Sequence, residues 1–132
     1  MEFDILGPRK GRLKRDYNYF ATPIMGYRES ISSPLTDRCS IYENGHLRVH
    51  TGFEWDFATG AIDTPDMVKA SLAHDALCGL INHGKLPASE QKAADKFFRK
   101  VLKECGTSWF RRWYAYLAVR AYQMVFNNGT TK

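Results

Sequence analysis

The sequence predicts an α+β fold in which a small antiparallel β layer with a hairpin is followed by a three-helix cluster around a buried central helix. Three observations predict this class. Strand-forming and turn residues gather between residues 21 and 62, segments of helical length follow between residues 64 and 126, and the first of these segments is apolar on nearly every side. With 132 residues, 44% of them hydrophobic, the chain is expected to form a single domain over residues 1–132.

The first twenty residues are expected to form a basic N-terminal arm. Residues 7–15 contain five basic residues, two glycines and a proline, with almost no apolar content, which is typical of an extended basic segment. Residues 17–28 are partly aromatic and are interrupted by Pro23 and Gly26, so they fit a short edge strand. The β layer and its loop are therefore placed between residues 21 and 62.

The clearest strand signal is the stretch from residue 39 to residue 50. It contains Asn44-Gly45, a dipeptide that favours a two-residue type I′ hairpin turn because both positions take a positive φ. By alternation, the residues expected to face the core are Ile41 and Leu47 or Val49. The segment that follows, residues 52–63, starts extended and then becomes a loop of small residues, so the β layer has three or four short strands.

Three helices are predicted after the β layer. Thr64-Pro65 marks the first helix start, because threonine caps and proline suits the first helical position; this helix runs to about Asn82. Its apolar residues nearly encircle it, which is typical of a helix buried on most sides. The second helix is expected over residues 89–105 and the third over residues 108–126, with the tail beyond it frayed.

Composition excludes several classes of protein. No run of eighteen apolar residues is present, so no membrane span is expected, and the N-terminus lacks the order of a signal peptide. The formal net charge of +5 combines basic ends with an acidic middle, and no nucleic-acid-binding motif accompanies it, so nucleic acid is not the favoured partner. Three cysteines are too few for a disulfide scaffold, and Cys78 and Cys105 are interpreted as small buried apolar residues.

His74 and Asp75 lie in the middle of the helix predicted to be the most buried. Ionisable side chains there require hydrogen-bond partners, and Asp95 in the second helix is the natural candidate if the two helices pack antiparallel. A carboxylate that holds one imidazole nitrogen leaves the other nitrogen free to act as a base. His74 and Asp95 are therefore candidate catalytic residues, and the alternative is a buried pair that only staples two helices.

A candidate cation site precedes and adjoins this helix. Asp56 and Asp63 flank a segment of small residues whose carbonyls and carboxylates suit a hard divalent cation, with Asp75 as a further oxygen ligand. In the alternative interpretation, Asp63 caps the helix and Asp56 bonds a backbone amide in the turn. The residues predicted to bind a metal are Asp56 and Asp75.

A basic aromatic surface is predicted on the third helix. Trp113 lies beside Arg112 and Arg120, and tryptophan, tyrosine and arginine favour protein interfaces. These three residues are therefore candidate partner-binding residues, with a second copy of the chain or another protein as the partner. Stacking of nucleobases or contact with lipid headgroups are the alternatives.

Six short segments between residues 47 and 125 form a series. They are Gly52-Phe53, Asp56-Phe-Ala-Thr59, Ile62-Asp63-Thr64, Ala73-His74-Asp75-Ala-Leu77, Ala94-Asp95-Lys-Phe97, and Leu102 with Gly106. Together they resemble domain-of-unknown-function family 1353, whose members are mostly encoded by tailed phages and prophages and have no assigned activity. The chain departs from the usual pattern at Phe57, Thr59 and Cys78, where glycine, serine and tyrosine are usual. The resemblance implies a protein of the host cytoplasm or the virion, with a phage or host protein as its partner.

A second resemblance concerns layout. The order His74-Asp75 followed by Cys78, then Asp95, is similar to the active site of short bacterial secretory phospholipases, whose glycine-rich calcium loop and paired disulfides are missing here. In those enzymes the histidine activates water, the adjacent aspartate binds calcium and a later aspartate orients the histidine. This layout implies a hydrolase with a His-Asp-Asp site and a divalent ion, calcium being favoured. The alternative is a non-enzymatic virion component or host-directed accessory protein in which the cluster is structural.

Overall fold

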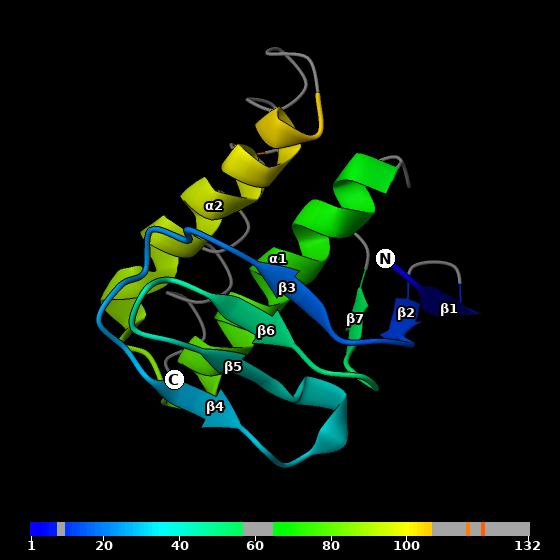
Figure 1. Cartoon of the computed structure of the whole chain (residues 1–132), viewed down its shortest axis with the longest axis horizontal. Helices are drawn as coiled ribbons and strands as arrows, with labels where there is room; N and C mark the ends of the chain where they lie inside the picture. Colours follow the sequence, from blue (N-terminus) through cyan, green and yellow to red (C-terminus); the bar gives the residue numbers. More distant parts are fainter. Residues whose placement is uncertain (8–9, 57–64, 107–115, 117–119, 121–132) are drawn as a thin grey trace.

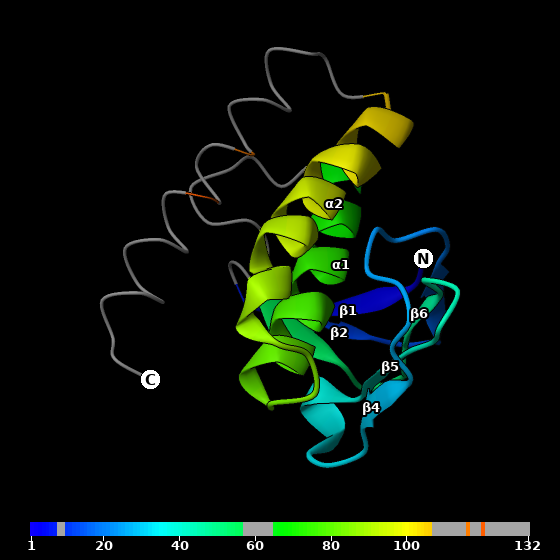
Figure 2. The same ribbon diagram turned by 90° about the vertical axis from the view of Figure 1, so that its left-hand side faces the viewer.

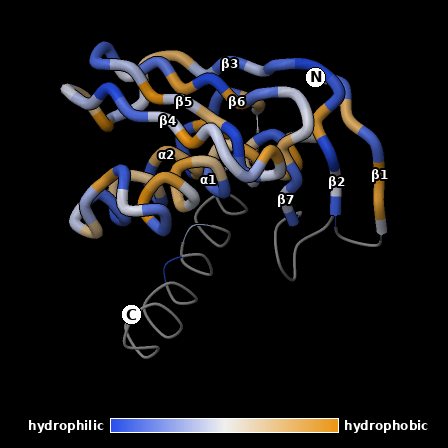
Figure 3. Tube along the Cα trace, turned by 90° about the horizontal axis from the view of Figure 1, so that it is seen from below, coloured by the Kyte–Doolittle hydropathy of each residue, from blue (hydrophilic) through white to orange (hydrophobic). Residues whose placement is uncertain are grey.

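The computed structural model describes residues 1–7, 10–56, 65–106, 116 and 120, and it has the predicted α+β fold (Figure 1). Within these residues, seven strands form two antiparallel sheets. Two α-helices, α1 (Pro65–Asn82) and α2 (Gln91–Glu104), lie side by side on one side of the sheets (Figures 2 and 3). None of the described helices has the length and apolar composition needed to cross a membrane.

The two sheets share no strand. The three-stranded sheet has the order β1 (Phe3–Gly7), β2 (Lys10–Leu13), β7 (Glu54–Asp56). The four-stranded sheet has the order β3 (Tyr17–Tyr19), β6 (Leu47–Val49), β5 (Cys39–Ile41), β4 (Glu29–Ile31). Two short 3₁₀ helices, η1 (Leu35–Asp37) and η2 (Ala88–Glu90), complete the described elements, and α1 contacts strands of both sheets.

The prediction of a basic N-terminal arm over residues 1–20 is wrong, because β1, β2 and β3 lie in this segment and are part of the β layer. Along β2 the exposure alternates, so that Gly11 and Leu13 are buried while Lys10 and Arg12 face outward. The two outward basic groups lie 3.6 and 3.9 Å from the carboxylate of Glu54 on β7. A strand needs apolar residues on only one face, so a basic composition does not exclude it.

The hairpin around Gly45 is confirmed, but its turn type differs from the prediction. β5 and β6 pair antiparallel with Ile41 opposite Leu47, and both of these side chains are fully buried. Gly45 has a φ of +83°, whereas Ala21 is the one described non-glycine residue with a positive φ, so Asn44 does not meet the requirement of a type I′ turn. The Gly45 amide donates to the Tyr42 carbonyl at 2.9 Å, as in a type I turn followed by a left-handed residue.

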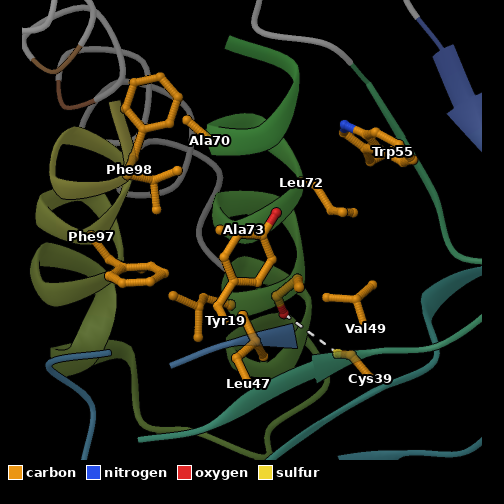
Figure 4. Close-up of a cluster of buried hydrophobic side chains, with 14 of the residues drawn as sticks. Tyr19, Cys39, Leu47, Val49, Trp55, Ala70, Leu72, Ala73, Phe97 and Phe98 are labelled. Atoms are coloured by element: carbon orange, nitrogen blue, oxygen red, sulfur yellow. Dashed lines mark hydrogen bonds between the residues drawn. The ribbon is translucent and has the colours of Figure 1, made fainter. Parts of the chain in front are cut away.

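The core surrounds α1. Figure 4 shows Phe97 of α2 turned toward α1 from one side, and Val49 of β6 facing α1 from the sheet side. Ala73 in the middle of α1 is fully buried, which confirms that this helix is the buried central one. The described residues contain two α-helices rather than three. The third predicted helix lies outside them except for Tyr116 and Arg120, both of which are helical.

Candidate functional site

The structure brings His74 of α1 and Asp95 of α2 into direct contact. The distance between Nε2 of His74 and Oδ1 of Asp95 is 2.6 Å, and both side chains are buried. This contact was expected because two adjacent helices leave few partners for polar groups in their interface. Since the bond joins an imidazole to a carboxylate in a buried setting, it is a charge-assisted hydrogen bond, which is stronger than a bond between neutral groups.

Asp95 accepts hydrogen bonds from three side chains. Besides His74, Nε2 of Gln91 donates to Oδ1 at 3.0 Å, and Nη1 of Arg120 donates to Oδ2 at 2.9 Å. Burial acts to raise the pKa of Asp95, but the hydrogen bonds and the charge of His74 outweigh it, so this pKa lies below its ordinary value. Asp95 is therefore an ionised carboxylate although it is fully buried.

The guanidinium of Arg120 points into the site. Its side chain is half-buried and forms an ion pair with Asp95. One of the three residues of the predicted basic aromatic surface therefore also contacts the buried Asp95. The other two, Arg112 and Trp113, lie outside the described residues, and the prediction of a partner-binding surface stays a prediction.

The environment of His74 favours its charged form. Burial opposes the imidazolium, but the Cys78 sulfur and the Asp95 carboxylate outweigh burial, so the pKa of His74 is raised. The ring of Phe98 contacts the imidazole edge to face, with 5.6 Å between ring centroids. Near neutral pH the site therefore holds a protonated imidazole against an ionised carboxylate.

Sequence reasoning missed two members of this site, Cys78 and Gln91. The Cys78 sulfur lies 3.8 Å from Nδ1 and 3.6 Å from Nε2 of His74, and Nε2 of Gln91 donates to this sulfur at 3.3 Å. The spacing of four residues between His74 and Cys78 places both on one helix face and was the available signal. The residues of this site, below called the His74 cluster, are His74, Cys78, Gln91, Asp95 and Arg120.

Asp56 and Asp75 are also in contact, but the contact is made by the backbone of Asp56 and not by its carboxylate. The backbone N–H of Asp56 donates to Oδ2 of Asp75 at 3.2 Å, which ties the end of β7 to α1. Burial, with a smaller contribution from the Asp56 charge, raises the pKa of Asp75 to about 7. Asp63 lies outside the described residues. Among those that are described, no three His, Cys, Asp or Glu side chains are grouped to hold a metal ion, so the divalent-ion site stays a prediction.

A comparison with protein-family models identifies the family of this chain. The family model described as "Protein of unknown function (DUF1353)" matches residues 35–119, a range that includes both α-helices and four of the five members of the His74 cluster. No curated protein and no solved structure matches the chain. The match covers more than half of the sequence and agrees with the segments that carried the resemblance, and the chain belongs to the DUF1353 family.

Proposed function

We propose that this protein is a small hydrolase in which His74 is the acid–base group and Asp95 is the carboxylate that orients it. The observation that carries the proposal is the bond of 2.6 Å between Nε2 of His74 and Oδ1 of Asp95. General acid–base catalysis requires an imidazole held in one orientation and one tautomer, and a buried carboxylate provides both. A catalytic role would also explain why two ionisable side chains lie in the apolar interface between α1 and α2.

The cluster leaves one ring nitrogen for chemistry. Asp95 engages Nε2, so proton transfer to and from a substrate falls to Nδ1 of His74. With its raised pKa, the ring carries a proton near neutral pH and is prepared to protonate a leaving group. After that transfer, the neutral ring is a base that accepts a proton from water.

Gln91 and Arg120 serve as positioning residues in this proposal. Each donates a hydrogen bond to a different oxygen of Asp95, so the carboxylate is fixed at both ends. A fixed carboxylate keeps the imidazole from rotating, and catalysis depends steeply on such geometry. The divalent ion predicted at Asp56 and Asp75 is separable, and the proposal does not depend on it.

The experiment measures hydrolysis of p-nitrophenyl butyrate by the full chain and by two variants, His74→Gln and Asp95→Asn. We expect each substitution to lower the rate by about 100-fold or more, the usual contribution of a positioned acid–base group. His83 and Asp37 form an exposed pair at 3.0 Å, so His83→Gln and Asp37→Asn are matched controls that retain full activity. Equal rates in all five folded proteins would overturn the proposal.

A second function is favoured by the burial of the cluster. His74 is only 7% exposed, and every buried side-chain nitrogen or oxygen of the described residues has a hydrogen-bond partner. In this alternative the cluster staples α1 to α2, and the protein is a non-enzymatic virion component or host-directed accessory factor. Absence of any His74-dependent turnover by a folded protein, together with specific capture of one phage or host protein, would favour this alternative.

A further inference from the structure

We propose that Cys78 is the nucleophile of this site and carries the acyl group of an ester substrate as a thioester. This inference rests on the proposed hydrolase function and specifies its chemistry. Nucleophilic catalysis by cysteine requires a base beside the sulfur and a third group that orients the base. Cys78, His74 and Asp95 fulfil these roles in order, since the sulfur lies 3.8 Å from Nδ1 and 3.6 Å from Nε2 of the imidazole that Asp95 holds through Nε2.

Cys78 differs from the other two cysteines. Cys39 is fully buried, its thiol donates to the Ala76 carbonyl at 3.7 Å, and burial raises its pKa to about 12, so it is unreactive. Cys105 is exposed and follows the end of α2. Among the described residues, Cys78 is the cysteine whose sulfur contacts a histidine ring, and it is half-buried rather than sealed from solvent.

Gln91 places a donor where negative charge develops. Its side-chain amide donates both to the Cys78 sulfur and to Asp95. When the sulfur attacks a carbonyl carbon, the carbonyl oxygen becomes an oxyanion close to the sulfur. An amide N–H already directed at the sulfur is suited to transfer its hydrogen bond to that oxyanion, and one such donor contributes about 100-fold or more to the rate.

The reaction has two balanced steps. In the first, the sulfur of Cys78 attacks as the thiolate, the nucleophilic form of cysteine, and bonds to the ester carbonyl carbon. The carbon–oxygen bond to the alcohol breaks, and the alcohol leaves with the proton from His74. In the second, water loses a proton to His74 and bonds to the thioester carbon. The carbon–sulfur bond breaks, the carboxylic acid is released, and Cys78 and His74 return to their initial state. The sum consumes one ester and one water without any redox change.

The experiment uses p-nitrophenyl acetate as the acyl donor and the full chain. After a brief reaction and acid quench, peptide mass mapping locates the acetyl group on Cys78 and not on Cys105. Cys78→Ala removes both this adduct and turnover, whereas Cys105→Ser preserves both. In parallel, iodoacetamide is expected to label Cys78 about tenfold faster than Cys105 at pH 6.5, and His74→Gln removes the difference.

The outcomes separate this inference from the proposed function. Retention of His74-dependent hydrolysis by Cys78→Ala overturns the thioester and leaves the hydrolase proposal standing. An acetyl group that accumulates on Cys78 without turnover supports the nucleophile and overturns the hydrolase. Labelling of Cys105 faster than Cys78 in the wild type, with no acetyl on Cys78, overturns the inference even if His74→Gln fails to fold.

Discussion

Two histidine–aspartate pairs in this molecule have the same chemistry and different surroundings. His74 pairs with Asp95 at 2.6 Å, and their side chains are 8% and 0% exposed. His83 pairs with Asp37 at 3.0 Å, and their side chains are 31% and 41% exposed. The first pair joins α1 to α2, whereas the second joins the end of α1 to the short helix η1.

The comparison shows that burial, rather than the identity of the two residues, determines how many further hydrogen-bond partners a histidine–aspartate pair needs. An exposed pair is solvated by water and contributes between about 0 and 1 kcal/mol, so it needs no further partners. A buried pair loses its water, and each remaining lone pair or proton must find a protein group. Gln91 and Arg120 are these additional groups for Asp95, which is why the buried pair is part of a five-residue cluster.

The largest expected effect is on the free energy of unfolding, which should respond differently when the aspartate of each pair is replaced. Asp95→Asn removes the charge that balances His74 and Arg120, so we expect the free energy of unfolding to fall by about 3–5 kcal/mol. Asp37→Asn at the exposed pair should lower it by less than about 1 kcal/mol. Urea unfolding of both variants at pH 7 measures this, and similar losses would contradict the contrast between the pairs.

Asp75, a carboxyl whose pKa is dominated by burial rather than by the nearby charge of His74, sharpens the comparison. Because burial raises the pKa of Asp75 from 3.8 to about 7, its ionisation opposes folding as pH rises through that value. Asp75→Asn removes the charge and keeps an oxygen to accept the Asp56 amide, so it should stabilise the fold by about 4 kcal/mol at pH 8 and by less than about 1 kcal/mol at pH 4. Urea unfolding of the wild type and of Asp75→Asn at pH 4 and pH 8 tests this prediction. Equal stabilisation at both pH values would contradict it.

The pH dependence of the buried pair follows from the two shifted pKa values. The raised pKa of His74 gives stability that is complete below 6.5 and is lost as pH rises toward about 10. The lowered pKa of Asp95 gives stability present above 3.8 and lost as pH falls below it. The difference in unfolding free energy between wild type and Asp95→Asn should therefore shrink by more than about 1 kcal/mol between pH 5 and pH 9.

The exposed pair supplies the control for that profile. His83→Gln is expected to follow the wild-type dependence on pH over the same range, because the His83–Asp37 pair is exposed and contributes little to stability. A wild-type profile that matches Asp95→Asn at every pH would show that the buried pair is not charged.

The smallest expected effect concerns the predicted calcium site. If Asp56 and Asp75 hold calcium, the ion should raise the free energy of unfolding by about 1 kcal/mol at a concentration several times its dissociation constant. Asp56→Asn and Asp75→Asn should abolish the rise, whereas Asp4→Asn on the exposed face of β1 should preserve it. Thermal melts with and without calcium measure this. A wild-type melt that ignores calcium would refute the site.

The sequence predicted the buried pair because its signal is local. A histidine within an apolar helix requires a partner, and few acidic residues were in reach, so Asp95 followed from helix packing. The contact of Arg120 with Asp95 was not predicted, because it depends on how two segments of the chain pack together and not on residue type. The interpretation of Cys78 as an apolar residue rests on residue type alone, whereas its contacts are with the neighbouring ring of His74 and amide of Gln91.

The β layer shows a different limit. The hairpin at Gly45 was predicted because turn chemistry resides in consecutive residues. β2 was missed because its pairing with β7 joins residues more than forty positions apart, and its basic side chains gave it the composition of a solvated arm. Non-local pairing leaves little trace in a short segment, so a strand of four residues is recognised only once its partners are placed.

The two sheets include strands that lie before the residues matched by the family model, so the segment needed to form them is longer than residues 35–119. A fragment limited to residues 35–119 would lack β1 to β4. It would therefore lack β2, the partner of β7, together with β3 and β4, which pair with one edge of β6 and of β5. β7 ends at Asp56, whose amide is bonded to Asp75 in α1, so loss of the N-terminal strands would expose the segment beside the cluster. The residues matched by the family model therefore need the N-terminal strands to complete both sheets, and a fragment without them would have open strand edges, which favour aggregation.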